Sequence, residues 1–142
     1  MRSLLDINVL IALLDASHVM HDTATGWLEK NLNEGWASCP ITQNGVIRIM
    51  SQPAYPNSHA LLDVSNRLSL ACAENYHIFW PDEVSILDSK FFKRDNILGH
   101  RQITDVYLLA LAVYNEGRFV TFDKRVSVES VINAKEENLC LI

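Results

Sequence analysis

Leu4-Leu5-Asp6-Ile7-Asn8, close to the start of the chain, predicts a short strand over Ser3–Leu5 that ends at an acid. Four later stretches are equally short and also run into a polar or turn residue. Segments with helical spacing separate them, an alternation typical of βαβ units and a mainly parallel sheet with helices on both faces. We therefore predict an α/β fold, a three-layer α/β/α sandwich. The further strands are expected at Trp36–Cys39, His77–Trp80, Phe119–Phe122 and Leu139–Ile142.

Helical periodicity is clear in three of the intervening segments. In Asp22–Asn33 the apolar residues recur at helical spacing and leave charged side chains facing water. Ser58–Ala73 has the same pattern, with Ser58 as the expected N-cap. Ile103–Asn115 is almost entirely apolar or small, so its helix should be buried on most sides. Pro53–Asn57 is predicted to be a turn between two helices.

Length and composition favour one compact domain, residues 1–142. A chain of this length lies within the usual range for a single domain, and 49% hydrophobic residues can form a core without disulfide or metal staples. The three cysteines show no short pairwise spacing, which argues against a zinc ribbon or a disulfide framework. They are expected to be reduced thiols.

The apolar start superficially resembles a signal peptide, but Asp6 and Asn8 would lie inside its apolar region. The longest uninterrupted apolar run, Val106–Tyr114, is far shorter than the roughly 20 residues that cross a bilayer. We expect a cytoplasmic protein with no membrane partner.

The net charge of −5 would by itself argue against a nucleic-acid partner, because the phosphate backbone favours clustered Lys and Arg. The basic residues, however, are grouped along the chain. Each group could form a small positive surface or simply belong to a solvated helix face. The groups are Lys90, Lys93, Arg94 and Arg101, and then Lys124 and Arg125.

Three acids are predicted to meet at one edge of the sheet. Asp6 and Asp123 each follow a strand, and the carboxyl edge of a parallel sheet is where open α/β proteins bind ligands. Asp105 lies in the first turn of the apolar helix that leads into the Phe119 strand, so its carboxylate could face the same cleft. Each acid alone also has a structural explanation, as a turn cap or as a charge that favours a helix start.

Carboxylates about 4 Å apart repel by roughly 4 kcal/mol at an effective dielectric near 20, so a cluster of them needs protons or a cation. Oxygen ligands favour Mg²⁺ or Mn²⁺, which keep bound waters that can act as nucleophiles. Three neighbours, Asn8, Thr104 and Thr121, could orient the carboxylates, although capping of a helix or turn explains them equally well.

The motifs around these acids resemble those of PIN domains, and their order and the length of the chain are similar to VapC-type toxins. Leu4–Asp15 looks like the first motif, Gly99–Ala110 the third, and Thr121–Arg125 the last. Cys39–Arg48 stands at the place of the second motif. It departs from the family at Gln43, where many members have a glutamate.

The resemblance implies a ribonuclease that depends on Mg²⁺ or Mn²⁺, cuts structured RNA such as tRNA, and is held inactive by a VapB-type antitoxin. It also implies a homodimer. By the same resemblance, Asp6 and Asp105 lead the metal ligands and Asp123 completes the acidic site. Gln43 would be the fourth catalytic group, although an amide brings no charge and cannot act as a base.

Two basic residues are candidate RNA contacts beside the acids. Arg101 lies in the loop before Asp105, where it could touch a phosphate, and Lys124 directly follows Asp123. His18 and His21 have a spacing seen in metal sites but lack a Cys or Glu partner in the local pattern, so zinc binding is disfavoured.

Two other functions fit parts of the pattern. A phosphotransfer hydrolase or receiver module also places an acid after the first strand, but here Asn8 stands where it needs a second acid, and no lysine ends a strand. A non-catalytic PIN-like domain that binds RNA or protein is the second alternative, which Gln43 makes credible.

Overall fold

The computed structural model describes residues 1–142 and contains a five-stranded sheet in the order β3-β2-β1-β4-β5. Every pair of neighbouring strands is parallel. All five strands lie where the sequence predicts them, within one residue at each end. Their bounds are β1 Ser3–Leu5, β2 Trp36–Ser38, β3 His77–Phe79, β4 Arg118–Thr121 and β5 Leu139–Leu141.

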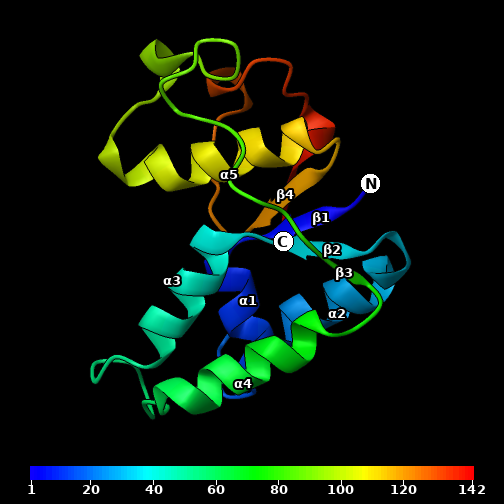
Figure 1. Cartoon of the computed structure of the whole chain (residues 1–142), viewed down its shortest axis with the longest axis vertical. Coiled ribbons are helices and arrows are strands. Elements are labelled where there is room, and N and C mark those ends of the chain that lie inside the picture. Colours follow the sequence, from blue (N-terminus) through cyan, green and yellow to red (C-terminus); the bar gives the residue numbers. More distant parts are fainter.

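Helices cover both faces of the sheet, which confirms the predicted three-layer sandwich (Figure 1). The helix α5 lies across one face, and α1 to α4 lie on the other. The helices are α1 Ile7–Leu14, α2 His21–Asn31, α3 Pro40–Met50, α4 Leu61–Cys72 and α5 Ile103–Tyr114. Short 3-10 turns occupy Leu32–Glu34, Arg94–Asn96, His100–Gln102, Val128–Ser130 and Glu136–Asn138.

The hydrophobic core is divided by the sheet into two clusters. Because side chains alternate along a strand, Leu4 and Phe119 pack on the side of α5. Leu5 and Val120, their neighbours in sequence, pack on the side of α1 to α4. This alternation fixes on which side of the sheet each residue that follows a strand can project.

Two expectations about the Ser58–Ala73 helix were wrong. The helix α4 begins at Leu61 with Ala60 at its N-cap, rather than at Ser58, because the chain is still non-helical at positions 58–60. The predicted apolar stripe is also only partly buried, since Val64 and Leu68 face the core whereas Leu61 is 61% exposed. The predicted turn at Pro53–Asn57 does separate α3 from α4.

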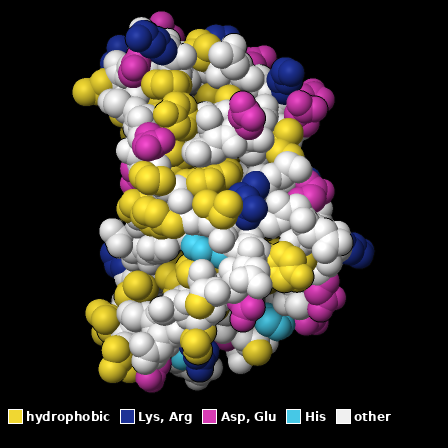
Figure 2. Space-filling model, turned by 45° about the vertical axis from the view of Figure 1, so that its right-hand side comes forward, with side chains coloured by type: hydrophobic (Ala, Val, Ile, Leu, Met, Phe, Trp, Pro, Cys, Tyr) yellow, Lys and Arg dark blue, Asp and Glu magenta, His cyan; other side chains and the backbone are white.

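The surface carries charges of both signs. On the face shown in Figure 2, acidic and basic side chains are scattered, and hydrophobic side chains form a broad band along one side. The net charge of −5 is therefore not spread as a uniformly acidic surface on this face. None of the helices is both long and apolar enough to traverse a membrane.

Candidate active site

The candidate site lies where the strand order reverses. From β1 the chain passes to β2 on one side of the sheet, whereas β4 pairs with β1 on the other side. In the shared register Leu5 is opposite Val120, and the Asp6 amide donates to the Val120 carbonyl (3.0 Å). Asp6 and the residues after β4 therefore meet at a topological switch point, the usual ligand position in such sheets.

Asp6 is the buried centre of the site, with only 4% of the residue exposed. One carboxylate oxygen caps α1 by accepting from the Ile7 amide (2.7 Å). The other accepts the hydroxyl of Thr121 (2.6 Å). Burial raises the pKa of Asp6, the bonds from Thr121 and Ile7 oppose that rise, and the Asp123 carboxylate adds to it.

Asp105 reaches the same site from the first turn of α5. Burial, together with the negative charges of Asp6 and Asp123, raises the pKa of Asp105 to about 6, although the positive charge of Arg125 opposes the rise. The charges of Asp6, Asp105 and Asp123 thus influence one another's pKa, and the expectation that the three acids form one metal site stays a prediction. They lie in an environment that disfavours their combined charge.

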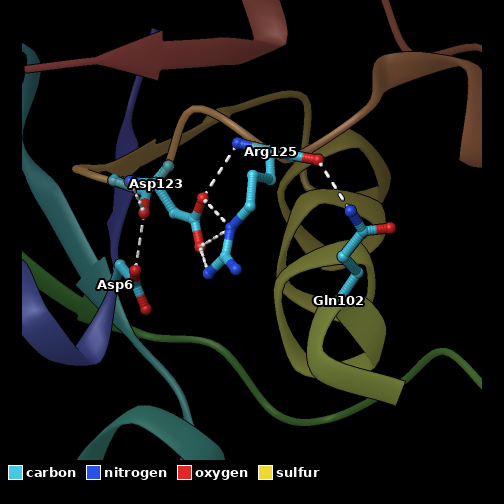
Figure 3. Close-up of polar contacts among 5 residues, drawn as sticks. Asp6, Gln102, Asp123 and Arg125 are labelled. Atoms are coloured by element: carbon cyan, nitrogen blue, oxygen red, sulfur yellow. Dashed lines mark hydrogen bonds and ion pairs between the residues drawn. The ribbon is translucent and has the colours of Figure 1, made fainter. Parts of the chain in front are cut away.

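Asp123 forms an ion pair with Arg125, a basic residue whose pairing with this acid the sequence did not predict. Arg125 clamps its carboxylate, with Nε donating at 3.0 and 3.2 Å and Nη2 at 2.6 Å (Figure 3). These bonds hold the pKa of Asp123 below its usual range. The Asp123 amide also donates to the Thr121 hydroxyl oxygen (3.1 Å), so Thr121 bridges Asp6 and Asp123.

Hydrogen bonds tie the loop that carries Arg125 to the start of α5. The Gln102 amide nitrogen donates to the Arg125 carbonyl (3.2 Å; Figure 3), and the Leu98 amide donates to the Gln102 side-chain oxygen (3.2 Å). The Arg125 amide is fixed by Asp123 (2.8 Å). The backbone of Arg125 is thus held on both sides.

The donor set suits a hard divalent cation. Asp6 and Asp105 provide carboxylate oxygens whose charge is disfavoured in the metal-free protein, and Mg²⁺ commonly uses only one or two carboxylates together with water. As folded, no group of three or more His, Cys, Asp or Glu side chains is placed to hold a metal. Asp123 is instead paired with Arg125.

The supporting residues predicted from sequence separate into two kinds. Thr121 is buried and bonds to Asp6, whereas Asn8 and Thr104 are exposed on the first turns of α1 and α5. Of the three, only Thr121 makes a side-chain hydrogen bond to a site carboxylate.

Gln43 contacts residues of β2 and α4. Its amide donates to the hydroxyl of Ser38 (3.0 Å), and it also lies against Cys72. Ser38 in turn bonds to the His77 ring (2.8 Å). None of the hydrogen bonds of Gln43 goes to Asp6, Asp105 or Asp123. The Gln43 side chain is thus bonded to Ser38, and its expected role beside the carboxylates stays a prediction.

The candidate RNA contacts lie on either side of Arg125. Arg101 is exposed and shares a hollow with Arg125, whereas Lys124 lines a separate hollow toward β5. The two histidines of the disfavoured zinc site have separate partners. His18 accepts from the Met20 amide (3.0 Å), and His21 bonds to the Ala12 carbonyl (2.7 Å).

Sequence reasoning missed Gln102, and it named Arg125 only as a member of a basic group without predicting its pairing with Asp123. The signal available for Arg125 was its place two residues after an acid at a strand end, where an Asp side chain commonly accepts the backbone N–H of a turn. No local signal indicated Gln102, because its partner is 23 residues away.

The fold and the site together define a class of protein: an α/β protein with acidic groups at the switch point of a parallel sheet. A PIN domain family model matches residues 3–129, and the chain belongs to this family. It is 47% identical to Ribonuclease VapC44 of Mycobacterium tuberculosis over 142 residues, all of both chains. Ribonuclease VapC39 of that organism is 39% identical over 130 residues, 87% of this chain and 89% of the relative.

The fold is shared with a solved complex. The structure aligns with a chain of VapBC2 from Rickettsia felis, crystallised on a DNA fragment from their promoter, with a TM-score of 0.61 and 14% identity. The match covers 100% of this chain and 98% of the other. Family membership decides against the receiver-like alternative.

Proposed function

We propose that this protein is an endoribonuclease, the toxin of a toxin–antitoxin pair, that hydrolyses phosphodiester bonds with the help of Mg²⁺ or Mn²⁺. The proposal is supported by the mutual charge influence of Asp6, Asp105 and Asp123 near the carboxyl edge of the sheet, in a chain 47% identical to a ribonuclease. Structured RNA such as tRNA is the substrate class that the VapC resemblance supports.

In this proposal Asp6 and Asp105 hold the cation, and Asp123 binds it or one of its waters. The cation would lower the pKa of a bound water and neutralise charge on the phosphate. Thr121 fixes the orientation of Asp6 through its hydroxyl bond, and burial of Asp6 keeps bulk water from one side of the site. The bond from Thr121 keeps one oxygen of Asp6 in place before substrate arrives.

A VapB-type protein is the proposed inhibitor. The homologous fold of VapBC2 supports such a partner. An apolar groove of about 480 Å³ between α1, α2 and α4, lined by Leu13, Leu28 and Leu68 among others, would suit the apolar face of a helix. A homodimer also stays a prediction, which light scattering on the purified protein tests.

The test is cleavage of labelled tRNA by purified protein freed of its partner, with EDTA and then with added Mn²⁺ or Mg²⁺. We expect no cleavage in EDTA and recovery with either metal. Cleavage that persists in EDTA would contradict the metal dependence. RNA binding without cleavage under any metal would favour the non-catalytic PIN-like domain.

A further inference from the structure

Arg125 lies at the boundary between the acidic site and a second, basic hollow. Its guanidinium is paired with Asp123, and Arg125 also lines a hollow of about 310 Å³ with the loop from Leu98 to Gln102. That loop contributes His100 and Arg101, so three basic side chains surround the hollow. The hollow is therefore lined by basic side chains, whereas the site beside it is acidic.

We propose that Arg125 is a substrate-positioning residue with two alternative partners, Asp123 in the free protein and a backbone phosphate of the RNA, next to the one cleaved, in the hollow lined by His100 and Arg101. The inference rests on the proposed function. It assigns this hollow as a phosphate subsite and Arg125 as the internal cation that competes with a metal ion for Asp123.

The backbone geometry allows the side chain to exchange partners without moving the loop. The Arg125 amide donates to Asp123 (2.8 Å), and its carbonyl accepts from Gln102 (3.2 Å). Only the side chain therefore has to rotate. It is 62% exposed, and all its side-chain hydrogen bonds go to Asp123, so leaving that carboxylate breaks no other hydrogen bond.

The energetics favour exchange rather than a permanent ion pair. Exposed ion pairs contribute little to stability because water screens them and two long side chains lose freedom. Arginine binds phosphate through two parallel N–H bonds, which makes a phosphate a strong alternative partner. The Arg101 guanidinium would add attraction in the same hollow, and the His100 ring could donate a hydrogen bond there.

The exchange couples RNA binding to metal binding. While Arg125 holds Asp123, the third carboxylate is neutralised and does not join the other two in a metal-binding group. A phosphate that draws Arg125 away leaves Asp123 free for the cation or its water. Removing the guanidinium should therefore strengthen metal binding and weaken RNA binding.

The experiment compares Arg125→Gln and Arg125→Lys with the parent, and uses Arg67→Gln as a control with the same charge change on an exposed residue of α4. Mn²⁺ affinity is measured by calorimetry without RNA. Binding of labelled tRNA is measured by anisotropy over a salt series, with each change placed in an Asp6→Asn background so that RNA is not cut.

We expect Arg125→Gln to bind Mn²⁺ several-fold more tightly and tRNA more weakly, with the salt slope of tRNA binding reduced by about one. Arg125→Lys should keep that salt slope, and Arg67→Gln should match the parent in both assays. Unchanged or weaker Mn²⁺ affinity in Arg125→Gln, or an unchanged salt slope, would overturn the inference. If the parent protein binds no tRNA, the proposed function is refuted instead. The calorimetric measurement of Mn²⁺ affinity does not depend on tRNA binding.

Discussion

Asp6 shows how one side chain can serve the fold and the site together. Its backbone continues the register between β1 and β4, one carboxylate oxygen caps α1, and the other accepts from Thr121. Asparagine keeps the shape and caps helices about as well as aspartate, but it removes the charge. Substitution by asparagine therefore separates the chemical role of the residue from its structural role.

We expect Asp6→Asn and Asp105→Asn each to abolish cleavage of tRNA while the protein stays folded. Because each change removes crowded negative charge, the metal-free variants should melt at the same temperature as the parent or slightly higher. Asp63→Asn, at an exposed position on α4, is the matched control. Undiminished cleavage by either site variant would remove that residue from the site.

The raised pKa of Asp105 predicts how stability depends on pH. A carboxyl group with a pKa of about 6 in the folded protein and about 4 when unfolded binds its proton more tightly in the folded state. Its favourable contribution is complete below pH about 4 and is lost as the pH rises through about 6. When metal is chelated, the melting temperature of the parent should therefore decrease as the pH rises from about 4 to about 6.

The Asp105→Asn variant supplies the control for that pH dependence, since its side chain cannot titrate. Its melting temperature should fall less than that of the parent over the same range. Identical pH profiles for the two proteins would show that Asp105 has an ordinary pKa.

At the scale of elements, the site depends on close contact between α1 and α3. A Cβ atom added at Gly45 of α3 would lie 2.4 Å from Cδ1 and 2.8 Å from Cγ1 of Ile7, the first residue of α1. Ile7 directly follows Asp6, so a displacement of α1 at this contact would also move a site carboxylate. Gly26 of α2, by contrast, has open space around it.

These two glycines make a matched pair for Gly→Ala substitution. Gly26→Ala should stabilise the protein by about 0.5–1 kcal/mol through helix propensity, whereas Gly45→Ala should destabilise it by about 1–3 kcal/mol through overpacking. Denaturant unfolding measures both. The double variant Gly45→Ala with Ile7→Ala should lose less free energy of unfolding than the sum of the losses in the two single variants. Strict additivity of those losses would contradict the proposed clash.

At the scale of the whole molecule, the apolar groove and the acidic site lie on different parts of the surface. The groove is formed by α1, α2 and α4, while the acids lie at the carboxyl edge of the strands, beside α5. A partner that binds in the apolar groove and also inhibits the nuclease must extend from the groove to the acidic site. An arginine of the partner placed against the carboxylates would provide the second contact.

We therefore expect a change in the groove to weaken inhibition without changing cleavage by the free enzyme. Leu13→Gln, at a half-buried groove position, should lower the affinity for the co-expressed partner, because it removes apolar area from that contact. Leu61→Gln, exposed on α4 and outside the groove lining, is the control. Equal inhibition of all three proteins would place the partner elsewhere.

Much of the architecture could be predicted from local pattern. The strands, the buried α5 and the acids at strand ends follow from periodicity and from residues next to each other in the sequence. The start of α4 was missed because Ser58 is a good capping residue that the chain does not use. The helix begins at Leu61, and its N-cap Ala60 makes no side-chain hydrogen bond.

What only the tertiary structure decided is which distant groups meet. The pairing of β1 with β4 joins Asp6 to Thr121 across 115 residues, the phase of α3 turns Gln43 toward Ser38, and the loop after β4 brings Arg125 onto Asp123. Local pattern can place an acid at the end of a strand, because a strand end depends on neighbouring residues. The partner of that acid depends on strand order and helix rotation, which are set by burial over the whole chain and leave no mark at any single position.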